Sequence, residues 1–306
     1  MKFNNLKINK KILLNSLKFT LSVLIISYLV NYLSINSIYI SFQNADKLII
    51  LFAFLLLPIN IFLQYKRWAL LCLTVESNNK INIAKSIFLG IAAGLITPLK
   101  AGEFLGRAFI FDSKKIKEYI ILSIYDRLIS MLVTVLIGFV FALLTFSKIT
   151  KLIAYYYIPI LSIIAILGIL ILFMLKYKIF PSVNNRLNQI IYRVRSISIT
   201  VNIKLIFLAI LFFFTYVFQF ALLLAAFNGI SKVFSYLSAG VLVFFTNTVI
   251  PPITLGELGI REGAAVYYSQ FFNYIAQTGF NASIMLFTIN IIVPAILGLI
   301  IYLREK

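Results

Sequence analysis

The sequence predicts an all-α polytopic membrane protein, with one integral membrane domain over residues 1–306. Of the 306 residues, 62% are hydrophobic and only 12% are charged, and the mean hydropathy is +1.02. Soluble domains have about 25% charged residues, so this composition excludes an ordinary soluble domain. Several apolar runs also reach the roughly 20 residues that a membrane-spanning helix needs.

Eight apolar segments follow one another along the chain. Six are uninterrupted and are predicted to be full transmembrane helices: 17–35, 48–65, 119–147, 152–175, 205–228 and 281–302. The other two, at 83–111 and 235–275, are interrupted by Gly, Pro and charged residues. Such interruptions are unusual in a simple lipid-facing helix, so we predict two re-entrant broken-helix hairpins there.

Lys and Arg in short loops indicate the cytoplasmic side, because positive charge is retained there. They cluster in the N-terminal tail, in the loops around 66–85, 114–117 and 176–204, and at the C-terminus. We therefore predict a cytoplasmic membrane protein with both termini in the cytoplasm and hairpins that enter from opposite faces. The formal charge of +19 is expected to meet anionic phospholipids at the cytoplasmic face, and no nucleic acid partner is expected.

The two interrupted segments contain the same motif. Residues 98–107 and 252–261 both read P-x3-G-E-x3-R and hold the only two Gly-Glu dipeptides of the chain. The copies divide the chain into halves, 1–150 and 151–306, and the three predicted spans between them would invert the second copy. Inverted repeats with Gly- and Pro-interrupted segments are typical of alternating-access transporters, whose broken helices meet near the membrane midplane.

Proline and glycine in the motif are predicted to break each hairpin. Pro98 and Gly102 in the first copy, and Pro252 and Gly256 in the second, would expose backbone groups that only protein or a water-filled cavity can satisfy. We expect a helix to begin just after each glycine and to direct its positive N-terminal dipole toward an anionic group.

The charged residues of the motif are four positions apart. Glu103 and Arg107, and likewise Glu257 and Arg261, would share a helix face and form an ion pair. Each pair either contacts a substrate or only staples its own hairpin, because polar groups at membrane depth serve both purposes. Glu262 is either an additional substrate contact or a second partner for Arg261.

Two further charged groups lie in or beside predicted spans. Asp126 and Arg127 lie about two turns inside the span at 119–147, either facing the protein interior or snorkelling at a helix end. The tripeptide Lys66-Arg67-Trp68 follows the span at 48–65. Because Trp and positive charge both favour the headgroup region, we interpret it as an interfacial anchor that belongs to no site.

Together these motifs resemble the lysylphosphatidylglycerol synthase transmembrane region, or flippase-like domain family. The resemblance depends on residues 97–107, the Asp126-Arg127 pair and residues 251–263, and covers nearly the whole chain. It implies a lipid translocase fold with polar positions at Glu103, Arg107, Asp126, Arg127, Glu257, Arg261 and Glu262. Asp126 replaces the Glu more usual in the family. The soluble aminoacyltransferase domain of full-length synthases is missing, so no lysine transfer is expected.

The leading hypothesis is a flippase, not an enzyme, that moves a charged, glycosylated or polyprenyl-linked lipid through a polar groove between the hairpins. Arg107, Arg127 and Arg261 would contact phosphate, and the carboxylates would hold these arginines, contact the headgroup or take up a coupling proton. With no His, one Cys and no Walker-type sequence, no metal, cofactor or ATP site is expected.

Two alternatives use the same residues. An ion-coupled secondary transporter of a small soluble anion would have the same inverted architecture. An intramembrane lipid-modifying enzyme would have to work through the carboxylates of Glu103 and Glu257 alone.

Overall fold

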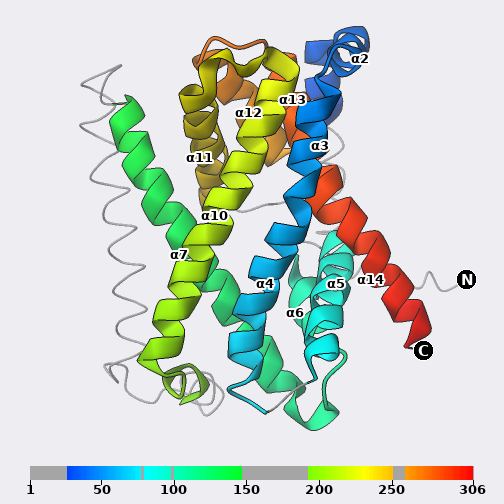
Figure 1. The fold of residues 1–306 in the computed structure, drawn as a ribbon, viewed down its shortest axis with the longest axis vertical. Helices are drawn as coiled ribbons and strands as arrows, with labels where there is room; N and C mark the ends of the chain where they lie inside the picture. The colour runs from blue at the N-terminus through cyan, green and yellow to red at the C-terminus, as the bar shows by residue number, and fades with distance from the viewer. Residues whose placement is uncertain (1–25, 77–78, 98–99, 147–191, 251–258, 306) are drawn as a thin grey trace, which may run out of the picture.

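The computed structural model describes residues 26–76, 79–97, 100–146, 192–250 and 259–305, and its described elements are helices in an elongated bundle (Figure 1). Four helical segments are long and apolar enough to cross a membrane: Lys47–Cys72, Ser113–Thr145, Ile199–Asn228 and Ala276–Arg304. They coincide with four of the six predicted spans. The predicted span at 152–175 lies outside the described residues, and only residues 26–33 and Ile35 of the first span are described as helix.

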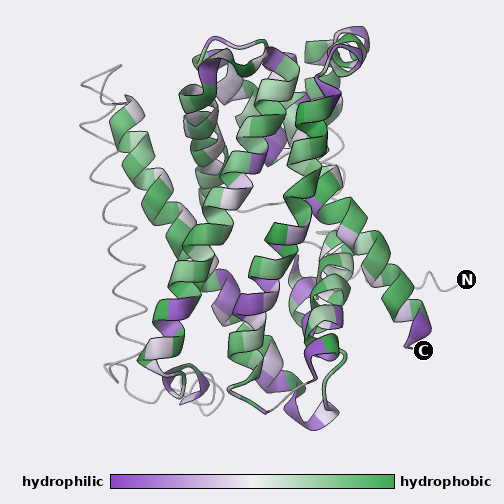
Figure 2. Cartoon of the chain, viewed as in Figure 1, coloured by the Kyte–Doolittle hydropathy of each residue, from purple (hydrophilic) through white to green (hydrophobic). Residues whose placement is uncertain are grey.

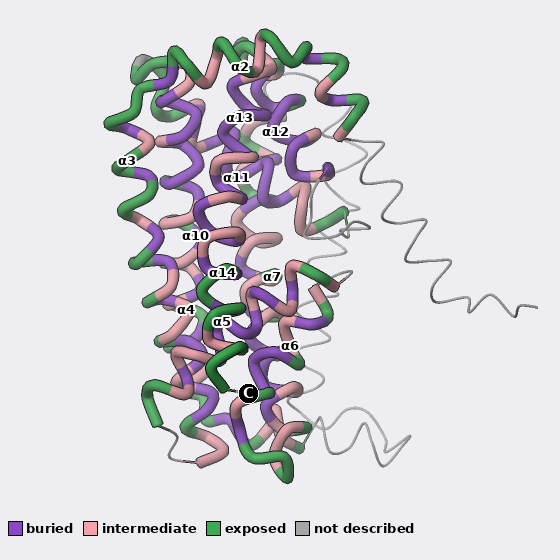
Figure 3. Tube along the Cα trace, turned by 90° about the vertical axis from the view of Figure 1, so that its right-hand side faces the viewer, coloured by how far each residue is buried: buried purple, intermediate pink, exposed green. Residues whose placement is uncertain are grey.

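The first long segment is one helix interrupted near its middle, α3 (Lys47–Leu55) followed by α4 (Leu57–Cys72). Asp46 caps its start, since the carboxylate accepts hydrogen bonds from the N–H groups of Leu48 and Ile49 at 2.9 and 3.2 Å. Pro58 lies in the first turn of α4 and has no N–H to continue the hydrogen bonds of α3, which explains the interruption. Before it, α2 (Ile35–Gln43) runs across the upper end of the bundle (Figure 3).

The remaining long segments form the body of the bundle. They are α7 (Ile116–Phe146) after the short 3-10 helix η1 (Ser113–Lys115), α10 (Ile199–Asn228), and a final segment of α13 (Ala276–Phe287), the π-helix η3 (Thr288–Ile292) and α14 (Val293–Arg304). Pro294 follows the π-helix and has no N–H for the usual hydrogen bond one turn back. The broken ladder leaves a local widening of the helix where Asn290 is buried.

Two shorter helix pairs correspond to the interrupted segments. Helices α5 (Lys80–Ile96) and α6 (Ala101–Ala108) form an antiparallel hairpin in the lower half of the molecule. Helices α11 (Val233–Val249) and α12 (Ile260–Phe271) pack in the upper half (Figure 1), after the short 3-10 helix η2 (Ile230–Lys232). With 8 residues, α6 extends about 12 Å at 1.5 Å per residue, so it cannot cross a bilayer core of about 30 Å.

Charged residues join several chain segments at the lower end of the molecule. Lys85 at the start of α5 pairs with Glu305 after α14 at 2.5 Å, and Arg193 before α10 pairs with Glu118 of α7 at 3.3 Å. Figure 2 shows hydrophilic residues gathered at this end, whereas most of each long helix is apolar. The described parts of the Lys- and Arg-rich loops therefore share one end, and their location in the cytoplasm stays a prediction.

The buried centre of the bundle is built around α10. Leu205, Phe220 and Leu223 of this helix are fully buried, and Leu242 of α11 packs in the same cluster. The outer surface is also apolar, for example at Phe52 of α3, which is 53% exposed. A surface of this kind is suited to contact with lipid rather than with water.

Candidate functional site

The turn between α5 and α6 positions the first motif. Helix α5 ends at Ile96, and Thr97 is extended, as expected for a residue that precedes proline. The Thr97 hydroxyl accepts a hydrogen bond from the N–H of Gly102 at 2.7 Å, and Lys100 adopts a left-handed conformation with φ 53°. Pro98 itself lies outside the described residues. Helix α6 begins at Ala101, so the prediction that it begins after Gly102 was wrong by two residues.

Gly102 and Gly106 let α6 lie directly against α5. A Cβ atom on Gly102 would be 2.4 Å from the carbonyl oxygen of Ala93, and one on Gly106 would be 2.5 Å from that of Leu89. These distances are too short for any side chain, so both glycines are required by close helix packing. Neither is needed here for a positive φ angle, in contrast to Lys100.

Close packing of the hairpin presents Glu103 and Arg107 toward α7. They form the predicted ion pair, with Arg107 Nη2 and Glu103 Oε1 2.6 Å apart. Arg107 also pairs with Asp126 of α7, 3.1 Å between Nη1 and Oδ2. Glu103 pairs with Arg127, 3.1 Å between Oε2 and Nη1. Asp126 and Arg127 thus both turn inward, and each binds a residue of the hairpin.

A residue that sequence reasoning assigned to no site completes this network. Arg67 of α4 is 2% exposed, and its Nη2 lies 2.5 Å from Asp126 Oδ1 and 2.9 Å from the Asp126 carbonyl oxygen. Arg67 also donates to the hydroxyl of Ser130. The interpretation of Lys66-Arg67-Trp68 as an interfacial anchor was therefore wrong for Arg67 and Trp68. Because Asp126 neutralises Arg67, α4 continues past this charge to Cys72 inside the protein.

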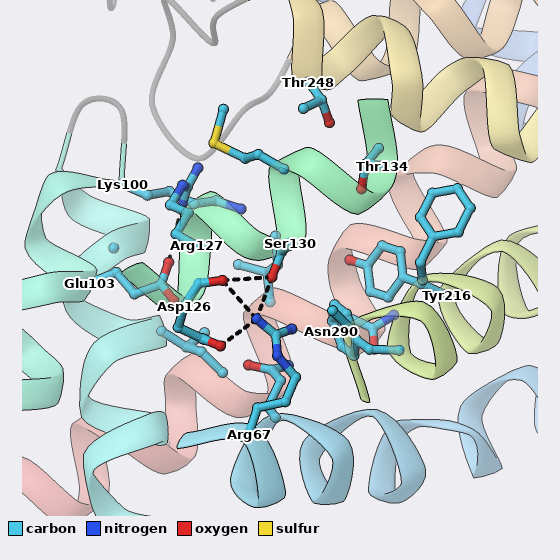
Figure 4. A pocket seen from close by; sticks show the side chains of 18 of the residues that line it. Arg67, Lys100, Glu103, Asp126, Arg127, Ser130, Thr134, Tyr216, Thr248 and Asn290 are labelled. Carbon is cyan, nitrogen blue, oxygen red and sulfur yellow. Dashed lines mark hydrogen bonds and ion pairs between the residues drawn. The ribbon is translucent and has the colours of Figure 1, made fainter. Parts of the chain in front are cut away.

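The charged groups alternate along one chain of contacts, Arg67–Asp126–Arg107–Glu103–Arg127 (Figure 4). Each carboxylate bridges two guanidinium groups, and burial makes such contacts stronger than they would be in water. Aromatic rings support two of the arginines. Arg107 lies 5.5 Å from the centre of the Trp68 ring, and Arg67 lies 5.7 Å from that of Phe212.

Trp68 is held in turn by α5. It is fully buried, and its indole N–H donates to the hydroxyl of Ser86 at 2.7 Å. The residue that the sequence suggested for the membrane surface is thus part of the wall behind Arg107.

The charged chain lines a cavity of about 260 Å³. Helices α4, α7 and α10, the α5–α6 hairpin, α11 and the π-helix all contribute to its wall. Both hairpins therefore reach the same cavity, the first through Lys100 and the second through Asn247 and Thr248 (Figure 4). Its polar and charged lining residues are Gln64, Arg67, Lys100, Glu103, Arg107, Ser123, Asp126, Arg127, Ser130, Thr134, Tyr216, Asn247, Thr248 and Asn290.

Three buried amide side chains lie beside the cavity. Asn60 of α4 and Asn290 of the π-helix each donate to the Gln219 side-chain oxygen at 2.7 Å, and Gln219 donates to the Ala53 carbonyl at 2.8 Å. This cluster links the interrupted helix α3–α4, α10 and the π-helix. Sequence reasoning missed it, although each amide stands alone in a long apolar run, which is the signal that could have found it.

The charged residues of the second hairpin lie elsewhere. Arg261 and Glu262 are buried and do not line the cavity. Glu262 accepts hydrogen bonds from Arg261 at 2.6 Å, from the Ser283 hydroxyl at 3.0 Å and from the Gly259 N–H at 2.6 Å. Of the two roles predicted for Glu262, its contacts match the partner of Arg261, which fastens α12 to α13.

The start of α12 also differs from the prediction. Gly259, with φ 99°, precedes the first helical residue, Ile260. Pro252, Gly256 and Glu257 lie outside the described residues, so the predicted Glu257–Arg261 pair is not described.

The fold and the site define a class: a helical, multi-pass membrane protein with a charged cavity between its helices. Residues 15–298 match the family described as Lysylphosphatidylglycerol synthase TM region, and the chain belongs to this family of membrane domains of flippase-like proteins. The resemblance identified in the motifs is confirmed. No curated protein matches the chain.

Proposed function

We propose that this protein is a lipid translocase that moves a lipid with a charged or glycosylated headgroup between the leaflets of the cytoplasmic membrane. The observation that supports this most is the cavity, in which five charged side chains form one chain of ion pairs inside a bundle of apolar helices. A headgroup must cross about 30 Å of hydrocarbon, where each unsatisfied polar group costs several kcal/mol. A cavity of this kind supplies polar partners while the acyl chains stay in lipid.

The two hairpins suggest how access alternates. They occupy opposite halves of the molecule, and both contribute to the cavity wall. We propose that they enter the membrane from opposite faces as an inverted repeat, and that their relative movement opens the cavity to one leaflet at a time. The lysine-rich lower end then lies in the cytoplasm, together with both termini, where it meets anionic phospholipids.

The residues of the cavity have distinct roles in this mechanism. The guanidinium groups bind headgroup oxygens, for which their planar forks are suited. Asp126 and Glu103 each hold two arginines in position, so the binding groups are oriented before the headgroup arrives. The side chain of Arg127 is 27% exposed, against 3% for Arg67, so Arg127 makes the first contact. The protein performs no covalent chemistry.

Glu103→Gln and Glu257→Gln are the variants that test this proposal. In proteoliposomes containing tail-labelled fluorescent lipids, each variant is expected to lose translocation and to keep its folded yield. For Glu103, Arg107 would still be held by Asp126, which is why the fold should survive. Glu305→Gln removes a carboxylate that does not line the cavity and serves as the control. Translocation at the wild-type rate by Glu103→Gln would contradict the proposal, as would aggregation of both variants, which would indicate structural staples.

A further inference from the structure

The charges of the cavity indicate what kind of headgroup it takes. Among its described lining residues, four are cationic, Arg67, Lys100, Arg107 and Arg127, and two are acidic. We propose, on the basis of the translocase function above, that the headgroup is net anionic, with a phosphate that no amine in the same headgroup offsets. We further propose Lys100 and Arg127 as the residues that bind this phosphate.

The described carboxylates of the cavity already have cationic partners. Both carboxylates already bind two guanidinium groups each. The Arg127 side chain is 27% exposed, so a ligand can reach its N–H donors, and a ligand that fits must supply oxygens to them. Phosphate supplies several and also carries the negative charge.

The turn of the first hairpin places Lys100 at the cavity. Its left-handed φ of 53° is uncommon for a residue with a side chain, and it lets the chain reverse directly before α6. The Lys100 carbonyl oxygen accepts a hydrogen bond from the N–H of Glu103 at 2.9 Å, and Glu103 binds Arg127. Lys100 and Arg127 therefore belong to the same end of the charged chain (Figure 4), and Arg67 belongs to the other.

A cationic headgroup would be unfavourable in this cavity. An aminoacylated phospholipid with a free amine would place further positive charge among four cations. Among the described lining residues, the carboxylates open to its amine are Glu103 and Asp126, and each is already bound to two arginines. Like charges at short distance in a desolvated site are strongly unfavourable. The cavity thus favours phosphatidic acid or phosphatidylglycerol over lysylphosphatidylglycerol, with zwitterionic phosphatidylethanolamine in between.

The experiment combines lipid binding and lipid movement. Native mass spectrometry of the full chain in detergent would measure binding of these four lipids, and proteoliposomes would measure translocation of their tail-labelled forms. Wild-type protein is expected to bind and move the two anionic lipids in preference. Lys100→Gln is expected to weaken binding of phosphatidic acid about tenfold, the effect of losing one charge-assisted contact. Lys100→Arg should restore it, and Lys114→Gln, an exposed lysine of η1, should have no effect.

The outcomes test the anionic-headgroup inference separately from the translocase proposal. Preference for lysylphosphatidylglycerol, or an unchanged affinity in Lys100→Gln, would overturn the inference and leave lipid translocation in place. Transport of soluble glycerol 3-phosphate with no movement of any lipid would support the anion site and overturn the lipid translocase. Preference for phosphatidic acid that is lost in Lys100→Gln and restored in Lys100→Arg would support both.

Discussion

Burial, rather than distance, should decide the strength of the Arg67–Asp126 pair. The ion pairs Arg67–Asp126 and Lys85–Glu305 both have N···O distances of 2.5 Å. The side chains of Arg67 and Asp126 are only 3% and 8% exposed, whereas those of Lys85 and Glu305 are each 34% exposed. Asp126→Asn is therefore expected to lower the free energy of unfolding by about 3–5 kcal/mol, as when a buried charge loses its partner. The matched change Glu305→Gln should cost less than about 1 kcal/mol.

The contacts of Asp126 explain why the loss of stability comes from the removed charge and not from a change in side-chain shape. Asparagine has nearly the same size as aspartate, so the substitution creates no cavity. Arg107 would keep Glu103 as a partner at 2.6 Å. Among the described residues, Arg67 would keep only neutral acceptors: the Ser130 hydroxyl, the backbone carbonyl oxygen of residue 126 and the amide oxygen of the new side chain. The loss therefore reports mainly on an uncompensated Arg67.

Trp68 offers a direct assay for this prediction. It is the only tryptophan of the chain, it is fully buried, and it lies beside the charged network. Unfolding in mixed micelles with increasing SDS, followed by its fluorescence, would give the free energy of unfolding for each variant. Equal losses in Asp126→Asn and Glu305→Gln would refute the reasoning, because burial would then have no effect on the pair.

Three further substitutions test the packing and the end of the bundle. Gly102→Ala should destabilise the protein by about 1–3 kcal/mol, because its methyl group would lie 2.4 Å from a backbone carbonyl of α5. Gln219→Leu should cost about 1–3 kcal/mol, because two buried amides lose their shared acceptor at 2.7 Å and keep only longer hydrogen bonds of 3.1 and 3.4 Å. Hydrogen bonds from Lys115 and Tyr119 lower the pKa of Glu76 from its usual 4.5. The stabilisation by the ionised Glu76 carboxylate should be complete above pH 4.5 and be lost as the pH falls through the lowered pKa. Glu76→Gln should remove this pH dependence.

Controls for these variants come from the same chain. Gly263→Ala should be neutral or slightly stabilising, since among the described residues no atom outside the adjoining backbone of α12 lies within 4 Å of its Cβ position. The same unfolding assay applies to Gly102→Ala and Gln219→Leu, and a wild-type free energy in either would exclude the packing or the amide cluster as described. For Glu76, thermal unfolding between pH 3 and 7 is the measurement. Parallel pH profiles for wild type and Glu76→Gln would contradict the expected contribution.

Local sequence was sufficient for the features that arise within one helix or one turn. The long apolar runs predicted four helical segments that the structure contains, and the four-residue spacing of Glu103 and Arg107 predicted their ion pair. These predictions succeed because hydrophobicity and helical periodicity depend only on neighbouring residues. The predicted start of α6 after Gly102 was wrong by two residues, because the hydrogen bond from Gly102 to Thr97 closes the turn earlier.

Contacts between distant segments were the source of the errors. Arg67 looked like a membrane anchor because its partner Asp126 is 59 residues away. A signal was present, since the apolar run resumes immediately after it with Trp68-Ala-Leu-Leu-Cys-Leu73. An arginine after which an apolar run resumes is more consistent with a paired, buried side chain than with a helix end.

By itself, the sequence determined that the chain is a helical membrane protein, that the chain turns between α5 and α6, and which short motifs carry charge, but it missed the interruptions at α3–α4 and at the π-helix. Only the tertiary structure decided which charges meet: Arg67 joins the network of α6 and α7, whereas Arg261 and Glu262 bind each other apart from the cavity. The physical reason is that helix formation is set by local composition. An ion pair or a cavity exists only where packing brings distant side chains within a few ångströms and removes them from solvent.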